Sequence, residues 1–314
     1  MSFSLFSALL FWAVLGGGCS RAQKSPPPAP PKPMVIHLPA SASPFRLLLP
    51  EGQNPGELPA QLEKVLGGKV EVASYADDAA AEKAVSEGAC DLAALSDRAA
   101  AALIAKKALQ PLPPVPGVPA PAPEFSHHYY DPAGTYTWPY GWSLLGWAAA
   151  PLPPAEMPRA WRDLARPGLS LSLPADPALR AALWALAEGK PPAEAGAPPP
   201  SWKEAKESAD AAVRVDFLWK LRGHLKEKEQ VFLPPGGSLI ALYQWAVPAS
   251  SKETERAAAA LQFLAAPENA ARIDQAWGVA ATQASAHALF SPALQADPLL
   301  YPGLPERNLC RFVR

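Results

Sequence analysis

Few residues of this chain have the types and spacing that catalysis or metal binding requires. The five histidines do not form a His-Glu-x-x-His pair, and neither a paired Cys-x-x-Cys nor a Gly-x-Ser-x-Gly motif occurs. The adjacent His127 and His128 would point to opposite faces of a strand, which disfavours a shared metal ion. Gly236 and Gly237 follow two prolines and do not open a phosphate-binding loop. The sequence therefore predicts neither an enzyme nor a metalloprotein, and no cofactor.

Aromatic side chains are the more promising binding groups, and many of them lie between Glu124 and Pro151. Aromatic faces attract cations and stack on sugar rings. Such a segment is compatible with a binding protein, including one for carbohydrates. The aromatic residues concerned are Phe125, Tyr129, Tyr130, Tyr136, Trp138, Tyr140, Trp142 and Trp147.

Length and composition narrow the class of protein further. The 314 residues are enough for two domains of ordinary size. The 28 basic and 29 acidic residues nearly cancel, so no electrostatic footprint indicates nucleic acid as a partner. The three cysteines, Cys19, Cys90 and Cys310, are too few for a disulfide scaffold. The sequence leaves open whether Cys90 and Cys310 pair.

The N-terminus has the features of an export signal. The apolar run Leu5–Leu15 is too short to span a bilayer but suits the core of a secretory signal. Small residues before Cys19 resemble a bacterial lipoprotein box, so residues 1–19 are expected to be a lipoprotein signal peptide that ends at this lipid-attachment cysteine. An ordinary signal peptide or a misplaced start codon is the alternative. The proline-rich residues 20–43 predict an extended tether.

The body of the chain alternates short apolar strands with helices. This alternation predicts an α/β fold with mostly parallel sheets that are covered on both faces. Strands are expected at 45–49, 69–72, 91–95, 169–173 and 213–218, and helices at 58–66, 79–87, 97–108 and 177–188.

The last third of the chain carries an ordered string of signals. An apolar strand ends in the turn Pro234–Gly237, and a second apolar run ends at Pro248. Ser250 and Glu253 then form a capping box before a helix. The string continues with a helix from Pro267 to Gly278, with Ser291-Pro292, and with Leu300-Tyr301-Pro302.

This order resembles the closing section of extracellular solute-binding proteins of the spermidine/putrescine type. The resemblance covers roughly residues 45–302, and it includes Leu109-Gln110-Pro111-Leu112, the crossover from Asp131 to Trp142, and Trp161-x-Asp163-Leu164. It implies an α/β, two-lobed periplasmic-binding-protein type II fold, in which mixed, mostly parallel sheets are joined by two crossing strands. Lobe 1 would comprise 44–139 plus 243–288, and lobe 2 would comprise 140–242 plus 289–314.

The resemblance also implies where a solute would bind, in the cleft between the lobes. A polyamine site needs carboxylates that face the amines and aromatic walls along the methylenes. The family's positions fall on Asp176, Trp219 and Ser96. Position matching and the crossing strands add Glu51 beside Pro50, then Trp142 and Ser143, and Tyr243 rather than Trp245.

Each of these residues also has a purely structural interpretation, and other positions depart from the family. Asp176 precedes Pro177 and would equally serve as a helix N-cap. Trp219 could pack under a loop, and Glu51 could be a solvated turn residue. The family's aspartate on the second crossing strand falls at Leu242 or Tyr243, and its second acid in lobe 2 falls at Leu179.

The resemblance implies the solute-binding component of an ABC importer, a monomer that takes up a small polyamine-like or other cationic or polar solute. It would be lipid-anchored on the periplasmic or cell-surface side of a bacterial membrane and would dock on an ABC permease. The alternative is a surface lipoprotein of the same fold that has lost polyamine binding and binds a different small ligand or a protein partner. The lost acids, and the expectation that no C-terminal helix is present, favour this alternative.

Overall fold

A computed structural model describes residues 38, 41, 43–153, 156–191, 194, 196–199, 202 and 210–312. The predicted signal peptide, Cys19 and most of the predicted tether lie outside these residues. All the described residues belong to one compact unit, Pro33–Arg314. At its start, the amides of Leu38 and Ser41 donate to the carbonyls of Val65 and Gly67, so this segment lies along the end of the first helix.

The first group of strands forms a parallel sheet. Strand β1 (Phe45–Pro50) lies between β2 (Val70–Tyr75) and β3 (Leu92–Ser96), and both pairings are parallel. The intervening helices are α1 (Leu58–Leu66), α2 (Asp78–Ser86) and α3 (Asp97–Ala105). These elements confirm the sequence prediction. Helix α3 ends three residues earlier than expected, where Lys107 adopts a positive φ of 55°.

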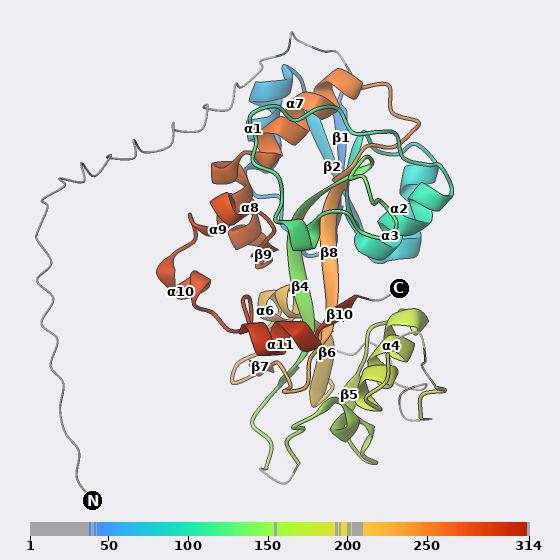
Figure 1. Cartoon of the computed structure of the whole chain (residues 1–314), viewed down its shortest axis with the longest axis vertical. Coiled ribbons are helices and arrows are strands. Elements are labelled where there is room, and N and C mark those ends of the chain that lie inside the picture. Colours follow the sequence, from blue (N-terminus) through green and yellow to red (C-terminus); the bar gives the residue numbers. More distant parts are fainter. Residues whose placement is uncertain are drawn as a thin grey trace, which may run out of the picture. The chain divides into compact units, whose positions relative to one another are not determined.

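Two long antiparallel strands, β4 (Thr137–Ala149) and β8 (Leu239–Ala246), connect this group to a second one. Among the described residues the strands form a 10-stranded sheet in which the order β2-β1-β3-β8-β4-β6-β5 runs from one group to the other. Figure 1 shows β4 and β8 running between the two groups, with β1 and β2 at the top and β5 and β6 at the bottom.

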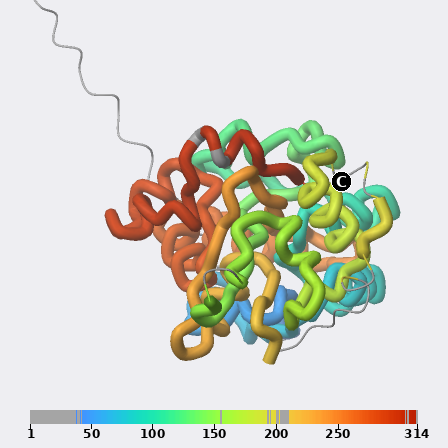
Figure 2. The backbone as a smooth tube through the Cα atoms, turned by 90° about the horizontal axis from the view of Figure 1, so that it is seen from below, coloured from blue at the N-terminus to red at the C-terminus, as the bar shows by residue number. Residues whose placement is uncertain are grey.

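The second group contains the short parallel strands β5 (Leu171–Ser172) and β6 (Val213–Phe217). Helices α4 (Pro177–Ala187) and α6 (Leu218–Gly223) belong to this group, and β7 (Gln230–Phe232) pairs with β4. The Trp161 indole, in the 3₁₀ turn Trp161–Ala165, donates to the carbonyl of Gly237 and so ties this turn to the Pro-Pro-Gly-Gly segment. Figure 2 views the molecule from this end.

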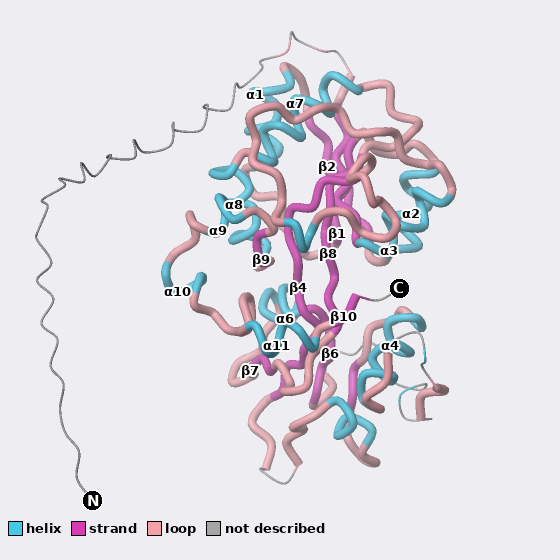
Figure 3. The backbone as a smooth tube through the Cα atoms, viewed as in Figure 1, coloured by secondary structure: helices cyan, strands magenta, loops and turns pink. Residues whose placement is uncertain are grey.

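The last third of the chain returns to the first group before it crosses again. Helices α7 (Thr254–Ala265) and α8 (Pro267–Trp277) precede β9 (Ala280–Ala281), and three short helices follow. Figure 3 shows α7 at the top, near α1, and α8 and α9 to the left of β4. The short elements are η1 (Pro123–Phe125), α9 (Ala284–His287), α10 (Pro292–Gln295), α11 (Leu304–Leu309) and β10 (Arg311–Phe312).

Two expectations about this region are wrong. Ser250 does not cap helix α7, because the helix begins at Thr254 and its N-cap residue is Glu253. The hydroxyl of Ser251 accepts from the Glu253 amide instead, in a turn before the helix. The C-terminal segment does contain a helix, α11, after which β10 adds a parallel strand to β8.

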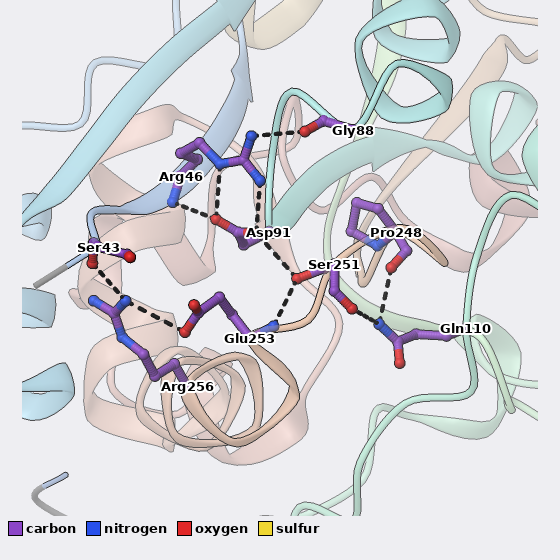
Figure 4. Close-up of polar contacts among 9 residues, drawn as sticks. All are labelled: Ser43, Arg46, Gly88, Asp91, Gln110, Pro248, Ser251, Glu253 and Arg256. Carbon is purple, nitrogen blue, oxygen red and sulfur yellow. Dashed lines mark hydrogen bonds and ion pairs between the residues drawn. The ribbon is translucent and has the colours of Figure 1, made fainter. Parts of the chain in front are cut away.

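A network of hydrogen bonds and ion pairs joins the start of β1, the residues before β3 and the segment between β8 and α7 (Figure 4). The Arg46 guanidinium donates to both oxygens of Asp91 at 3.0 and 2.9 Å, and Asp91 also accepts from the Ser251 hydroxyl at 3.0 Å. Burial raises the pKa of Asp91, but the bonds from Arg46 and Ser251 outweigh burial and lower the pKa overall. Gln110 donates to the carbonyls of Pro248 and Ser251, so the predicted Leu-Gln-Pro motif holds the segment that leaves β8.

The aromatic core lies on one face of the crossing strands. The Tyr140 ring packs against Trp245 at 4.7 Å between centroids and against Trp277 at 5.6 Å. Cys90 and Cys310 pack in separate hydrophobic clusters and are not joined by a disulfide. Within the described ranges, no helix has both the length and the hydrophobicity that crossing a bilayer requires.

Candidate functional site

A cavity of about 150 Å³ lies where the carboxyl ends of strands from both groups meet. Residues that follow β1, β2 and β3 line it from one side, and residues that follow β5 and β6 line it from the other. Strand β8 contributes Ile240, Ala241 and Tyr243 to its wall. Ligands of α/β proteins commonly bind outside the carboxyl ends of the strands. The fold therefore brings both groups of strands to one solute-sized space.

Most of the site residues predicted from the sequence line this cavity, although they are far apart along the chain. They are Pro50, Glu51, Ser96, Asp176, Trp219 and Tyr243.

Trp142 and Ser143 do not line the cavity. Trp142 lies opposite Leu242 on β8, so its side chain faces the side of the sheet away from Tyr243. There it stacks on Phe125 with 5.6 Å between ring centroids. Ser143 is buried, and its hydroxyl lies 3.5 Å from the carbonyl of Leu144. The predicted role of Trp142 and Ser143 in the cavity is therefore wrong, and β8 rather than β4 contributes to the cavity wall.

Asp176 serves two structural interactions at once. Its Oδ1 accepts hydrogen bonds from the amides of Ala178 and Leu179, which makes it the N-cap of α4. Its Oδ2 lies 2.9 Å from Nη2 of Arg98, which belongs to the first strand group. The capping role expected from the sequence and a place in the cavity therefore coexist.

Ser96 also caps a helix and contacts an acid. Its hydroxyl oxygen accepts from the Ala99 amide at 3.1 Å and its proton is donated to Oδ1 of Asp78 at 2.7 Å. The Arg98 guanidinium donates to Oδ2 of Asp78 from both Nε and Nη2, at 3.0 and 2.7 Å. Asp78, Arg98 and Asp176 thus form a continuous chain of charge across the cavity.

One wall of the cavity is aromatic. The Trp219 indole donates a 2.7 Å hydrogen bond to the Tyr243 hydroxyl, and their rings meet edge to face. Burial raises the pKa of Tyr243, so the phenol stays neutral. Lys220 Nζ lies 5.7 Å from the Trp219 ring, within the range of a cation–π contact. This aromatic wall can pack against the apolar part of a bound solute, while the carboxylates of the cavity face its polar groups.

The sequence prediction missed charged residues at or near the carboxyl ends of β2, β3 and β6. The residues that line the cavity at these positions are Asp77, Asp78, Asp97, Arg98, Asp216 and Lys220. Their position near the carboxyl ends of strands was a signal that could have found them, because the carboxyl ends of parallel strands meet at one edge of the sheet.

Acidic groups outnumber basic ones in the lining, but they are not all charged at neutral pH. Burial raises the pKa of Asp97 to about 7, with a further rise from Asp78 and an opposing effect from Arg98. Nζ of Lys220 lies 3.9 Å from Oδ2 of Asp216, which is four residues earlier, on β6. Leu179, at the position of the family's second acid, lines the cavity as an apolar side chain. The cavity therefore carries a moderate negative charge.

A second space, of about 190 Å³, lies beside the loop that precedes β4 and includes His127 and His128. Nδ1 of His127 lies 2.8 Å from the carbonyl oxygen of Pro132, and burial lowers the pKa of His128. No cluster of three or more His, Cys, Asp or Glu side chains suited to a metal ion occurs within the described part of the chain. This second space offers much less charge than the first.

Comparison with known proteins identifies the fold. No protein-family model and no curated protein matches the sequence. Solved structures do match. A spermidine/putrescine ABC-transporter substrate-binding protein from Streptococcus pneumoniae is 18% identical, with a TM-score of 0.70 over 87% of this chain and 93% of its own.

Two further structures agree. A protein named for spermidine/putrescine ABC transport in Listeria monocytogenes is 20% identical, with a TM-score of 0.75 over 86% of this chain and 92% of its own. Iron-bound HitA from Pseudomonas aeruginosa is 16% identical, with a TM-score of 0.62 over 83% and 93%. The chain has the two-lobed periplasmic-binding-protein fold, as the sequence predicted. Because proteins of this fold hold ligands as different as these names indicate, the ligand must be argued from the site.

Proposed function

We propose that this protein is the solute-binding component of an ABC importer and that it binds a small cationic or polar, polyamine-like solute between its lobes. The observation that carries the proposal is the cavity lined by both strand groups, with Trp219 and Tyr243 on one wall and carboxylates around it. Carboxylates offset the cost of burying an ammonium group, and aromatic faces add attraction. The similar solved structures named for spermidine/putrescine transport support the same role.

Capture would follow from closure of the two lobes on the solute. The long strands β4 and β8 both run from one strand group to the other. A solute favours the closed form only if it binds that form more tightly, which contacts from both lobes supply. The closed form would then dock on an ABC permease as a monomer.

The proposed location is the periplasmic or cell-surface side of a bacterial membrane, with lipid on Cys19 as the anchor and residues 20–43 as the tether.

The size of the cavity is compatible with a small solute. Its volume of about 150 Å³ has room for on the order of ten water molecules, which matches a solute of small-metabolite size.

A second candidate function is a surface lipoprotein of this fold that no longer binds polyamines and takes a different small ligand or a protein partner. The ion pair between Arg98 and Asp176 favours it, because the acid expected to hold an amine already holds a guanidinium.

A thermal-shift screen of the full-length chain in detergent tests both candidates. Amines, amino acids, sugars and metal salts are compared at millimolar concentration. A solute at a hundred times its Kd stabilises the folded state by about 2.7 kcal/mol, which raises Tm measurably. A shift with small amines alone supports the first candidate. A shift only with other solutes supports the second, and no shift with any compound contradicts both small-solute readings.

A further inference from the structure

One cation of the protein itself, Arg98, pairs with two of the acids that line the cavity. Arg98 donates to Asp78 from Nε and Nη2 and lies 2.9 Å from Asp176, so two acids share one guanidinium. Asp78 also accepts the Ser96 hydroxyl. The carboxylates of Asp78 and Asp176 are therefore already engaged before any solute binds.

The contact joins the two lobes. Arg98 belongs to α3, which follows β3 in the first strand group, whereas Asp176 caps α4 beside β5 in the second. The exposed fraction of the side chain is 21% for Arg98 and for Asp78, and 30% for Asp176. Water therefore reaches this cluster only partly, and its charges act on a solute in the cavity more strongly than exposed charges would.

We propose that Arg98 determines the charge of the solute: its guanidinium takes the place of one ammonium group, so that the cavity accepts a solute with a single cationic group rather than a diamine. This inference rests on the proposed function of the cavity.

Charge and chain connectivity both lead to this conclusion. With Arg98 in place, Asp78 and Asp176 together present one net negative charge instead of two. A tethered guanidinium competes with a free ammonium at high effective concentration, and its planar fork fits carboxylates better than an ammonium does. A second ammonium group could pair with Asp78 or Asp176 only by displacing it. The aromatic wall of Trp219 and Tyr243 remains open to the apolar part of the solute.

Lys220 is a matched contrast to Arg98. It also lines the cavity, but among the described residues its ion pair is with Asp216 of its own lobe, at 3.9 Å between Nζ and Oδ2. Its removal changes the charge of the cavity by the same amount and leaves the bridge between the lobes intact.

The test compares 1-aminobutane with 1,4-diaminobutane, which have the same carbon chain and one or two ammonium groups. Isothermal titration of the full-length protein in detergent gives a Kd for each amine. We expect the unsubstituted protein to bind the diamine no more tightly than the monoamine. In Arg98→Gln the preference should move towards the diamine by at least about ten-fold, the lower end of what a hydrogen bond to a charged group contributes.

The matched variants fix the interpretation. Arg98→Lys keeps the charge and should stay near the parent preference, and Lys220→Gln should move the preference by less than Arg98→Gln does. Diamine binding to the unsubstituted protein that is ten-fold tighter than monoamine binding overturns the proposal without any variant. So does an unchanged preference in a folded Arg98→Gln. If neither amine binds any of these proteins, both the inference and the proposed amine-binding function fail.

Discussion

The indole Nε1 of Trp219 donates a 2.7 Å hydrogen bond to the hydroxyl of Tyr243, and this bond joins α6 to the crossing strand β8 at the cavity wall. Both side chains are buried. The bond fixes the edge-to-face arrangement of two rings that arrive from separate parts of the chain, and so it holds the aromatic wall in one orientation.

Trp219→Phe and Tyr243→Phe are therefore expected to be coupled. Each should lower the free energy of unfolding by about 1–3 kcal/mol, because each leaves a buried polar group without its partner. The loss in the double variant should be smaller than the sum of the two single losses by at least about 0.5 kcal/mol. Denaturant unfolding of the four proteins measures this coupling. Tyr75→Phe, which removes a separate bond to the Ala94 carbonyl, serves as the additive control with Trp219→Phe. Equal coupling in both cycles would contradict a specific Trp219–Tyr243 bond.

Asp176→Asn should separate the cap of α4 from the ion pair with Arg98. Asn caps helices nearly as well as Asp, so this variant loses the ion pair alone, which at this partly exposed position contributes at most about 1 kcal/mol. Asp176→Ala loses the cap as well and should be less stable than Asp176→Asn by about another 1 kcal/mol. Unfolding measurements at low and high salt check both parts. Identical stability of the Asn and Ala variants would show that the cap contributes nothing.

Asp97 should make the protein less stable as the pH rises from about 4 to 7. Its pKa in the folded protein is about 7, against a reference value of 3.8, because burial disfavours the carboxylate. The folded state therefore keeps a proton that the unfolded state releases in this window. The stability that this group contributes is complete below about pH 4 and is lost as the pH rises to about 7. At 1.36 kcal/mol per pKa unit, the loss is roughly 4 kcal/mol at most.

Asp97→Asn removes this titration. Relative to the parent, the variant should have a higher free energy of unfolding at pH 8 and no higher one at pH 4. Comparing the change between pH 4 and pH 8 in the two proteins removes any effect of the substitution that does not depend on pH. Chemical denaturation at several pH values measures it. A constant difference across the range would mean that Asp97 has the same pKa in both states.

Gly237→Ala should destabilise the protein more than Gly236→Ala does. Both glycines have positive φ, 96° and 108°, which costs a residue with a side chain about 1–3 kcal/mol. A Cβ at Gly237 would in addition overlap the carbonyl of Leu309 in α11, whereas a Cβ at Gly236 meets no atom within 4 Å. Thermal unfolding of the two variants compares strain alone with strain plus overlap. Equal losses would mean that α11 does not press on this turn.

Cys19→Ala tests the proposed anchor. If Cys19 carries lipid, the parent should partition into the membrane fraction, and the variant should appear as a soluble or unprocessed protein. Fractionation of bacterial cells followed by immunoblotting distinguishes the two. As a control, Cys90→Ala should fractionate with the parent, since Cys90 lies in the folded body. Identical partitioning of Cys19→Ala and the parent would reject the lipid anchor.

Periodicity and end signals in the sequence predicted the secondary structure of the body well. Helix α1 begins and ends at the expected residues, Leu58 and Leu66, because Pro59 and Gly67 mark its two ends locally. One exception is the start of α7, where Ser250 and Glu253 have the spacing of a capping box but the chain makes another turn through Ser251. Local signals compete there, and the bond from Ser251 to Asp91, which is distant in the sequence, selects the turn.

The sequence by itself also determined that strands and helices alternate, and hence that strand ends from two groups carry polar residues to one edge. Only the tertiary structure decided which of those residues meet. Arg98 and Asp176 are 78 positions apart (176 − 98), and no pattern in the sequence pairs them. The crossing strands β4 and β8 bring them together. Trp142 shows the same limit, since its place behind the sheet follows from its register against Leu242. Periodicity is a local property, whereas register and packing across the sheet depend on contacts between distant segments, and these decide the site.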